Sequence, residues 1–155
     1  MALEPEPISA AAFKPFGALL DRKGAKTATA SLRAEVPTWV EIIAAPVVTQ
    51  GLHSVDCLER HKFATQTFIP IDVEAYLVLV CPHGDGGGPD LSQLHAFRVP
   101  GDTVIQYHAD TWHAGMTALG GGGRFANVMS RDFSDDDCEF HPLSDARIEI
   151  RVGET

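Results

Sequence analysis

The sequence is short of positive charge. Its 155 residues include 12 Lys and Arg against 21 Asp and Glu, which gives a formal net charge of −9. Proteins that bind phosphate backbones or anionic membranes carry clustered Lys and Arg, so this deficit argues against both kinds of partner. No run of five like charges occurs; the densest group, Asp135, Asp136 and Asp137, is expected to form a solvated turn.

Cysteine and long apolar runs are equally scarce. Cys57, Cys81 and Cys138 are odd in number and widely spaced, which is typical of reduced thiols in a cytosolic protein. The longest apolar run, residues 75–82, is far shorter than the ~20 residues of a membrane span. The first residues have neither a basic start nor an apolar core, so no signal peptide is expected. A soluble, cytoplasmic protein is predicted.

The remaining patterns predict an all-β protein with one short N-terminal helix. Residues 8–20 are the helix candidate, with Ser9 as its cap and Pro15 and Gly17 ending it early. Short β-rich segments bounded by Gly, Pro or Asp then follow, as in a sandwich or barrel. The expected strands are residues 39–45, 52–63, 67–71, 75–81, 95–99, 103–107, 124–130 and 147–152. Without a repeat or linker, residues 1–155 are expected to form one domain.

Two glycine-rich tracts, residues 84–88 and 120–123, are expected to be hairpin loops. Neither is followed by Lys-Ser/Thr or by a helix that would supply backbone donors to a phosphate. Residues 89–94 are compatible with a single helical turn.

A potential metal site lies between residues 59 and 66. Side chains two apart in a strand share a face, so Glu59 and His61 should point the same way, with Phe63 continuing that face. Gln66 follows a short bend, and His113 comes much later in the chain. Any one of these residues alone is more often a satisfied polar group near a sheet edge. Together they indicate a site, because buried charges are costly unless they are paired or bound to metal.

The residues before His113 are expected to point in alternating directions. If Tyr107 faces inward, His108 faces outward, while Trp112 is expected in the core or in a pocket wall. His113 is either a metal ligand or a general acid or base in the same pocket. Arg60 should point away from Glu59 and His61. Its role there is a salt bridge, a subunit contact or substrate binding. Lys62 is expected to be solvated.

These motifs resemble those of known families. Glu-x-His-x4-Gln at residues 59–66 with a late His113 is similar to the two metal motifs of cupins. The sequence resembles the ureidoglycolate lyases more specifically, at residues 58–61, 65–66, 68–70, 89–92, 96–97, 107–108 and 112–113. The resemblance implies a cupin-like double-stranded β-helix, a jelly-roll barrel, that forms a homodimer. It also implies cleavage of ureidoglycolate, a small molecule of allantoin catabolism, to glyoxylate and urea.

The resemblance also implies roles for individual residues. A divalent metal, nickel or zinc, would be held by Glu59, His61, Gln66 and His113. Catalysis would involve Glu59, His61, His113 and Tyr107, and substrate binding Gln66, His108 and Trp112.

The sequence departs from the family in its first third. Members usually carry Asn-x-Gly with a nearby Arg, and an Arg-Ala on the strand before the Glu-Arg-His motif. Here residues 29–33 read Thr-Ala-Ser-Leu-Arg and residues 42–45 read Ile-Ile-Ala-Ala. Arg33 can replace one arginine but the other is lost, and a carboxylate substrate favours an Arg fork. Two alternatives therefore stay open: a cupin isomerase or dioxygenase acting on another hydroxy or keto acid, or a non-catalytic metabolite-binding module.

Overall fold

The strand β9 (Ala75–Cys81) lies at the centre of the fold and is buried along its whole length. The computed structural model describes residues 1–143, 146 and 148–153 of the chain. Tyr76 and Val78 on one face of β9 belong to a first core cluster, and Leu77 and Leu79 on the other face belong to a second. Because alternate side chains point to opposite faces of a sheet, a continuous apolar run suits a strand covered on both faces.

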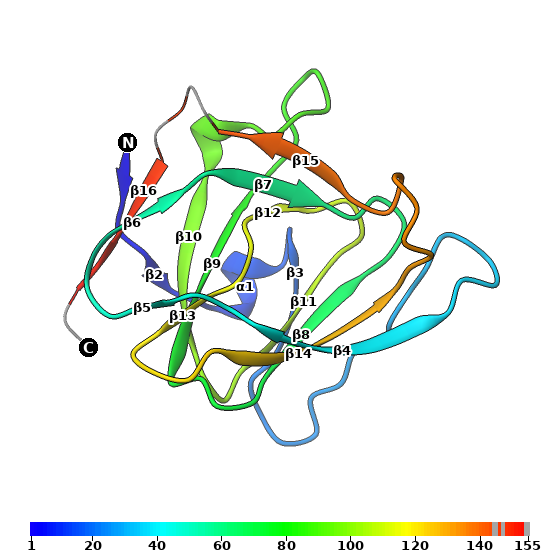
Figure 1. Ribbon diagram of the computed structural model, residues 1–155, viewed down its shortest axis with the longest axis horizontal. Helices are drawn as coiled ribbons and strands as arrows, with labels where there is room; N and C mark the ends of the chain where they lie inside the picture. The colour runs from blue at the N-terminus through cyan, green and yellow to red at the C-terminus, as the bar shows by residue number, and fades with distance from the viewer. Residues whose placement is uncertain (144–145, 147, 154–155) are drawn as a thin grey trace.

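The sheet that contains β9 carries the candidate site. Its strands follow the order β15, β7, β12, β9, β10 and β2, with β13 also paired to β9 and β5 paired to β13 (Figure 1). The neighbours of β9 have these bounds: β15 Glu139–Pro142, β7 Cys57–Arg60, β12 Trp112–His113, β10 His95–Pro100, β2 Glu6–Pro7, β13 Thr117–Leu119 and β5 Val47–Val48.

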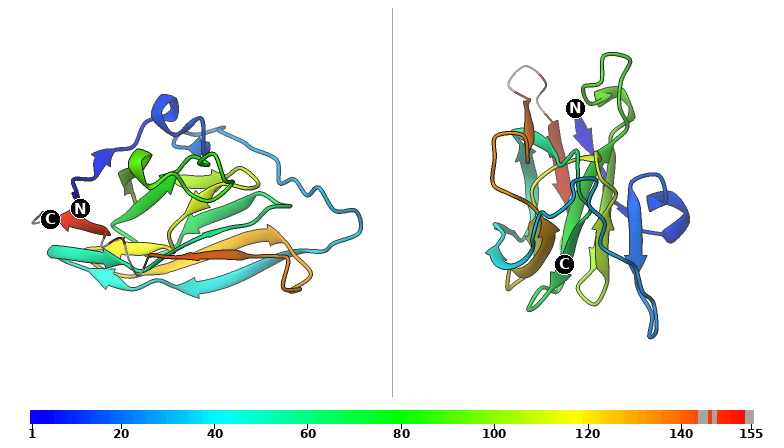
Figure 2. Two further views of the ribbon diagram at one scale, coloured as in Figure 1. Left: turned by 90° about the horizontal axis from the view of Figure 1, so that it is seen from above. Right: turned by 90° about the vertical axis from the view of Figure 1, so that its right-hand side faces the viewer.

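Two further sheets cover its faces. A five-stranded sheet has the order β3 (Gly17–Leu20), β11 (Val104–Tyr107), β8 (Gln66–Pro70), β14 (Arg124–Ser130) and β4 (Thr38–Ala44). It encloses the first cluster, where Phe68, Tyr76 and Phe125 meet edge to face. A small sheet of β1 (Ala2–Leu3), β16 (Ile148–Val152) and β6 (Gly51–Val55) covers the second cluster. The right-hand view of Figure 2 shows β3 on the opposite side of the molecule from β15 and β16. The expectation of an all-β, cupin-like fold with a short N-terminal helix is confirmed.

The helix is shorter than its sequence suggested. Helix α1 spans Ala10–Phe13, and Ser9 caps it by accepting from the Ala12 amide at 3.2 Å. Residues 17–20, expected at its end, form β3 instead, because they pair with β11. Gly17 makes this approach possible, since a Cβ at this position would lie 2.0 Å from the Gln106 carbonyl oxygen. Tertiary pairing here overrides local helix propensity.

Several other boundaries differ from the expected ones. The predicted strand over residues 52–63 is divided into β6 and β7 and ends at Arg60, so Phe63 lies outside it. The short strands β1, β2, β5, β13 and β15 were not expected. Both glycine tracts are loops, but only residues 84–88 join paired strands, β9 and β10; residues 120–123 lead from β13 to β14 in another sheet. Residues Leu91–Gln93 form a 3-10 turn, η1. The start of the last expected strand, residue 147, lies outside the described residues.

Two general expectations can be compared with the fold directly. All three cysteines are free thiols. Within the part of the chain that the structure describes, no helix has the length and apolar character needed to cross a bilayer.

Candidate metal centre

Glu59, His61 and His113 come together at the junction of β7 and β12. These strands are antiparallel and place His113 directly opposite Glu59, while His61 follows the end of β7. Glu59 Oε1 lies 3.4 Å from His113 Nε2 and 3.8 Å from His61 Nε2. All three potential ligand atoms lie within 4.8 Å of one another. The shared face predicted for Glu59 and His61 thus receives His113 from the neighbouring strand.

Backbone carbonyls fix the orientation of both imidazoles. His61 Nδ1 lies 3.1 Å from the Asp137 carbonyl oxygen, and His113 Nδ1 lies 2.9 Å from that of Thr111. A carbonyl only accepts, so each Nδ1 carries a hydrogen, and Nε2 is the nitrogen that faces Glu59. Both Nε2 atoms are buried without a hydrogen-bond partner among the described residues. Metal-binding histidines show this arrangement, with one nitrogen bonded to a carbonyl and the other free for the ion.

Glu59 supplies the negative charge of the site. Burial by itself would raise the pKa of Glu59, but contact with His113 and His61 outweighs burial and holds that pKa well below its usual range. The carboxylate is therefore ionised. Its Oε1 faces the two imidazoles, while Oε2 receives a weak contact from the Cys138 thiol, whose Sγ is 3.7 Å away.

The donor set fits a divalent metal. One carboxylate and two imidazoles are ligands of zinc, nickel and iron, and they do not select strongly among these ions. The two unpaired Nε2 atoms are the observation that favours an ion here, because a buried polar atom without a partner costs free energy.

A cavity of about 520 Å³ opens beside this centre. Gln66, the first residue of β8, lines it together with Glu59 and His61, and the Gln66 Oε1 atom is buried without a hydrogen-bond partner among the described residues. The structure therefore places the proposed ligand Gln66 in the wall of the same cavity. The remaining lining residues are Arg131, Ser134, Asp135, Cys138 and Phe140.

Tyr107 supports His113 from the core side. Its ring stacks on the His113 imidazole with centroids 4.2 Å apart and planes inclined by 20°. The phenol is fully buried, and burial raises the pKa of Tyr107 well above its ordinary value. Tyr107 therefore remains a neutral phenol that restricts the His113 ring.

His108 and Trp112 do not lie in this cavity. Strand alternation turns Trp112 to the opposite face from His113, where it is buried in the second core cluster. His108 is exposed, and its Nε2 lies 3.2 Å from the Lys14 carbonyl oxygen. It lines a different cavity of about 480 Å³, together with His83 and His95. The substrate-binding role that the resemblance implied for His108 and Trp112 is therefore corrected, whereas the outward direction of His108 and the core position of Trp112 agree with expectation.

Arg60 points away from the centre, as expected, and its partners are within the chain. Its guanidinium lies 2.8 Å from Glu139, 3.1 Å from Asp110 and 4.6 Å from the centroid of the Trp112 ring. Lys62 is exposed, as expected, and forms a surface ion pair with Glu139 at 2.6 Å.

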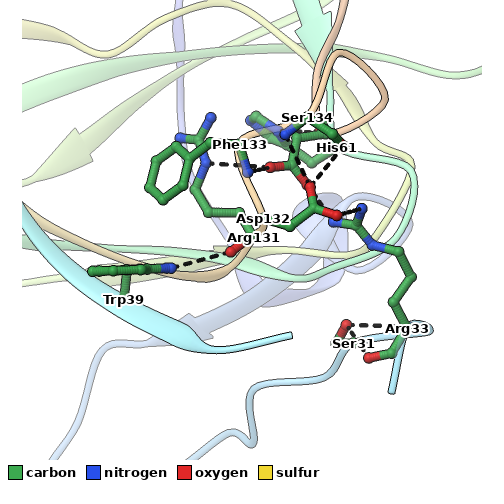
Figure 3. Close-up of polar contacts among 9 residues, drawn as sticks. Ser31, Arg33, Trp39, His61, Arg131, Asp132, Phe133 and Ser134 are labelled. Carbon is green, nitrogen blue, oxygen red and sulfur yellow. Dashed lines mark hydrogen bonds and ion pairs between the residues drawn. The ribbon is translucent and has the colours of Figure 1, made fainter. Parts of the chain in front are cut away.

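Asp137 was missed by the sequence analysis. Unlike its exposed neighbours Asp135 and Asp136, Asp137 is buried. Its carboxylate accepts from Arg33 Nη2 and from the Phe133 amide, and its carbonyl orients His61. These three partners are labelled in Figure 3. The local sequence carries no signal for this role, because Arg33 lies 104 residues earlier in the chain.

Fold and site together define an all-β, cupin-like protein with a two-histidine, one-carboxylate centre beside a cavity. The family model described as ureidoglycolate lyase matches residues 30–151. The chain belongs to the ureidoglycolate lyase family.

Individual relatives agree with this assignment. The ureidoglycolate lyase of Azotobacter vinelandii is 30% identical over 151 residues, covering 88% of this chain and 89% of that protein. The ureidoglycolate lyase of Saccharomyces cerevisiae is 40% identical over 101 residues, covering 56% of this chain and 51% of the yeast protein. A solved dTDP sugar isomerase from Desulfovibrio desulfuricans G20 covers 83% of this chain and 82% of its own, at 13% identity and a TM-score of 0.44. That likeness is too distant to assign an activity.

Proposed function

We propose that this protein is a ureidoglycolate lyase that releases glyoxylate and urea from ureidoglycolate in allantoin catabolism. The observation that carries the proposal is the pair of unpartnered Nε2 atoms of His61 and His113, which lie against ionised Glu59 at the edge of a cavity. Family membership selects ureidoglycolate among the substrates of cupin enzymes. We assign the activity to residues 1–155 as one domain, and its three free thiols support a cytoplasmic location.

The reaction divides one carbon centre. In ureidoglycolate, a single carbon carries a hydroxyl, a carboxylate and a urea nitrogen. The carbon–nitrogen bond breaks, the hydroxyl oxygen loses its proton and becomes the carbonyl of glyoxylate, and the leaving nitrogen gains a proton to give urea. A divalent metal, nickel or zinc, bound by Glu59, His61 and His113 with Gln66 beside them would supply a Lewis acid that lowers the pKa of the substrate hydroxyl.

The side chains contribute orientation and proton transfer. The carbonyls of Asp137 and Thr111 hold the hydrogen of each imidazole on Nδ1, and Tyr107 fixes the plane of the His113 ring. Glu59 Oε2 is the carboxylate oxygen directed away from the imidazoles, so it is the atom that we assign to accept the hydroxyl proton and return it to the leaving nitrogen.

A coupled assay on purified, metal-supplemented protein tests the activity. We expect glyoxylate and urea in equal amounts, without ammonia. Ammonia as the main product would instead indicate an amidohydrolase. Tight binding of ureidoglycolate without turnover would identify a metabolite-binding module and would contradict the proposal. Turnover of other hydroxy or keto acids in preference to ureidoglycolate would indicate a different cupin enzyme.

We also propose that two copies associate through the outer face of the five-stranded sheet. Val40, Ile42 and Ile69 on that face are 72%, 61% and 40% exposed. The strand register places Ile42 beside Ala126 and Ala126 beside Ile69, so the apolar side chains form a continuous row. Contiguous exposed apolar surface of this kind is typical of an interface, and a two-fold dimer would cover the row on both copies at once.

Replacing Ile42 by Glu is expected to convert this dimer into a monomer. The substitution places a carboxylate in the centre of the apolar row, where burial against a second copy would leave it unpaired. Sedimentation velocity at micromolar concentration measures the change. Leu52→Glu is the matched control, because Leu52 is 51% exposed on β6 in another sheet. A monomeric wild-type protein would rule out the dimer.

A further inference from the structure

Arg131 lines the same cavity as Glu59, His61 and Gln66. Among the described residues that line this cavity, it is the one with a permanently cationic side chain. Glu59 and Asp135 place carboxylates in the same wall, and the whole chain carries a net charge of −9. A local cation in this wall favours an anionic substrate that the overall field of the protein repels.

Contacts on three sides hold Arg131 in place. Its guanidinium lies 4.4 Å from the centroid of the Phe133 ring. Its Nε lies 3.7 Å from Asp137 Oδ2, which is an ion pair but too long for a hydrogen bond. The Trp39 ring nitrogen donates to the Arg131 carbonyl oxygen at 3.1 Å (Figure 3). The side chain is thus positioned before any ligand arrives.

The Nη end of the guanidinium is not used by the fold. Neither Nη atom of Arg131 forms a hydrogen bond or ion pair with the residues that the structure describes. Asp137, whose carboxylate binds Arg33 and the Phe133 amide, lies near Arg131 through Nε and not through an Nη atom. The paired Nη donors of an arginine match the two oxygens of a carboxylate, which they bind in a bidentate fork.

Arg33 is not available for this task. It binds Asp132 at 2.9 Å and also Asp137, and its guanidinium packs over the Phe63 ring at 4.7 Å. The arginine that the sequence suggested as a replacement for the missing family position is therefore structural, and Arg131 is the arginine at the cavity.

We propose that Arg131 binds the substrate carboxylate and thereby makes the site specific for 2-hydroxy acids over their neutral analogues. The inference rests on the proposed function, because it takes ureidoglycolate as the substrate. Binding the carboxylate at Arg131 would leave the hydroxyl on the same carbon to approach Glu59 and the two histidines.

The test compares glycolate with glycolamide, which differ in the charge of the carboxyl group. Calorimetric titrations use the full-length protein loaded with zinc, with zinc content measured for each variant. We expect wild type to prefer glycolate, and Arg131→Met to lower glycolate affinity by about 10- to 100-fold and remove this preference. Arg131→Lys should keep part of it. Arg124→Met is the matched control, because Arg124 pairs with Asp72 and does not line the cavity.

Kinetics separate this inference from the proposed function. In the lyase assay, Arg131→Met should raise the KM for ureidoglycolate by a similar factor. If wild type cleaves ureidoglycolate and Arg131→Met keeps both its KM and its preference for glycolate, the role of Arg131 is overturned while the function stands. If wild type cleaves no ureidoglycolate but Arg131→Met still removes the preference, the function fails and the carboxylate site stands. Thermal unfolding of Arg131→Met and Arg131→Lys verifies that both variants are folded. Arg131→Lys keeps a cation beside Phe133 and Asp137.

Discussion

Replacing His61 by alanine is expected to reduce ureidoglycolate cleavage by about 1,000-fold or more while the protein stays folded. His61 and His113 contribute the two unpartnered Nε2 atoms beside Glu59. Among the described residues, these two are the histidines of the cluster. Loss of a metal ligand removes several kcal/mol of transition-state stabilisation, and each 1.36 kcal/mol is about tenfold in rate. The coupled glyoxylate assay measures the rate, and metal analysis of the purified variant should show reduced metal content.

Lys62→Ala is the matched control for this variant. Lys62 follows His61 directly, but its half-exposed side chain pairs with Glu139 at the surface, and such pairs contribute about 1 kcal/mol or less. Its activity should stay near that of wild type. His61→Gln, which keeps a polar side chain of similar size, guards against a loss caused by unfolding. Activity within tenfold of wild type in folded His61→Ala would contradict the assignment of the site.

Asp137→Ala is expected to lower the free energy of unfolding by about 2 to 3 kcal/mol and to reduce activity as well. The substitution removes the acceptor for Arg33 and for the Phe133 amide. A buried group left without its partner costs about this amount. Arg33 keeps its bond to Asp132, so the loss should stay below that of a completely broken buried ion pair. Because the Asp137 carbonyl orients His61, movement of this segment should also affect the centre. Urea unfolding and the lyase assay measure the two effects.

Asp136→Ala supplies the comparison for Asp137. Asp136 lies in the same acidic run but is exposed, and surface substitutions of this kind usually stay within about 0.5 kcal/mol. Asp137→Asn keeps the shape of the side chain and should lose less stability than Asp137→Ala. Equal stability of Asp136→Ala and Asp137→Ala would contradict the structural role of Asp137.

The elements that depend on local pattern could be predicted from sequence. The run of β9 is apolar at every position, so it had to be a strand covered on both faces. Glu59 and His61 share a face because side-chain direction in a strand alternates, and this pattern extends to the His61 position just beyond β7. Both glycine tracts were placed correctly as loops for the same local reason.

The remaining features depend on partners that are distant in sequence. Strand β12 is too short to carry a pattern, so the opposite directions of Trp112 and His113 follow from its register against β7 and β9. Residues 17–20 leave the helix because β11 pairs with them. The burial of Asp137 depends on Arg33, and the position of Arg131 at the cavity depends on the packing of the segment around Asp137. None of these pairings is encoded within a local window of the sequence.

The most direct test of the central claim, that Glu59, His61 and His113 form the metal centre of a lyase, is to locate the ion. Crystals of the full-length protein grown with zinc, with diffraction data collected on both sides of the zinc absorption edge, would show it as an anomalous peak. We predict a peak within about 2.0 to 2.2 Å of His61 Nε2, His113 Nε2 and a Glu59 carboxylate oxygen. A zinc-loaded, active protein whose peak lies elsewhere, for example in the cavity lined by His83, His95 and His108, would contradict it.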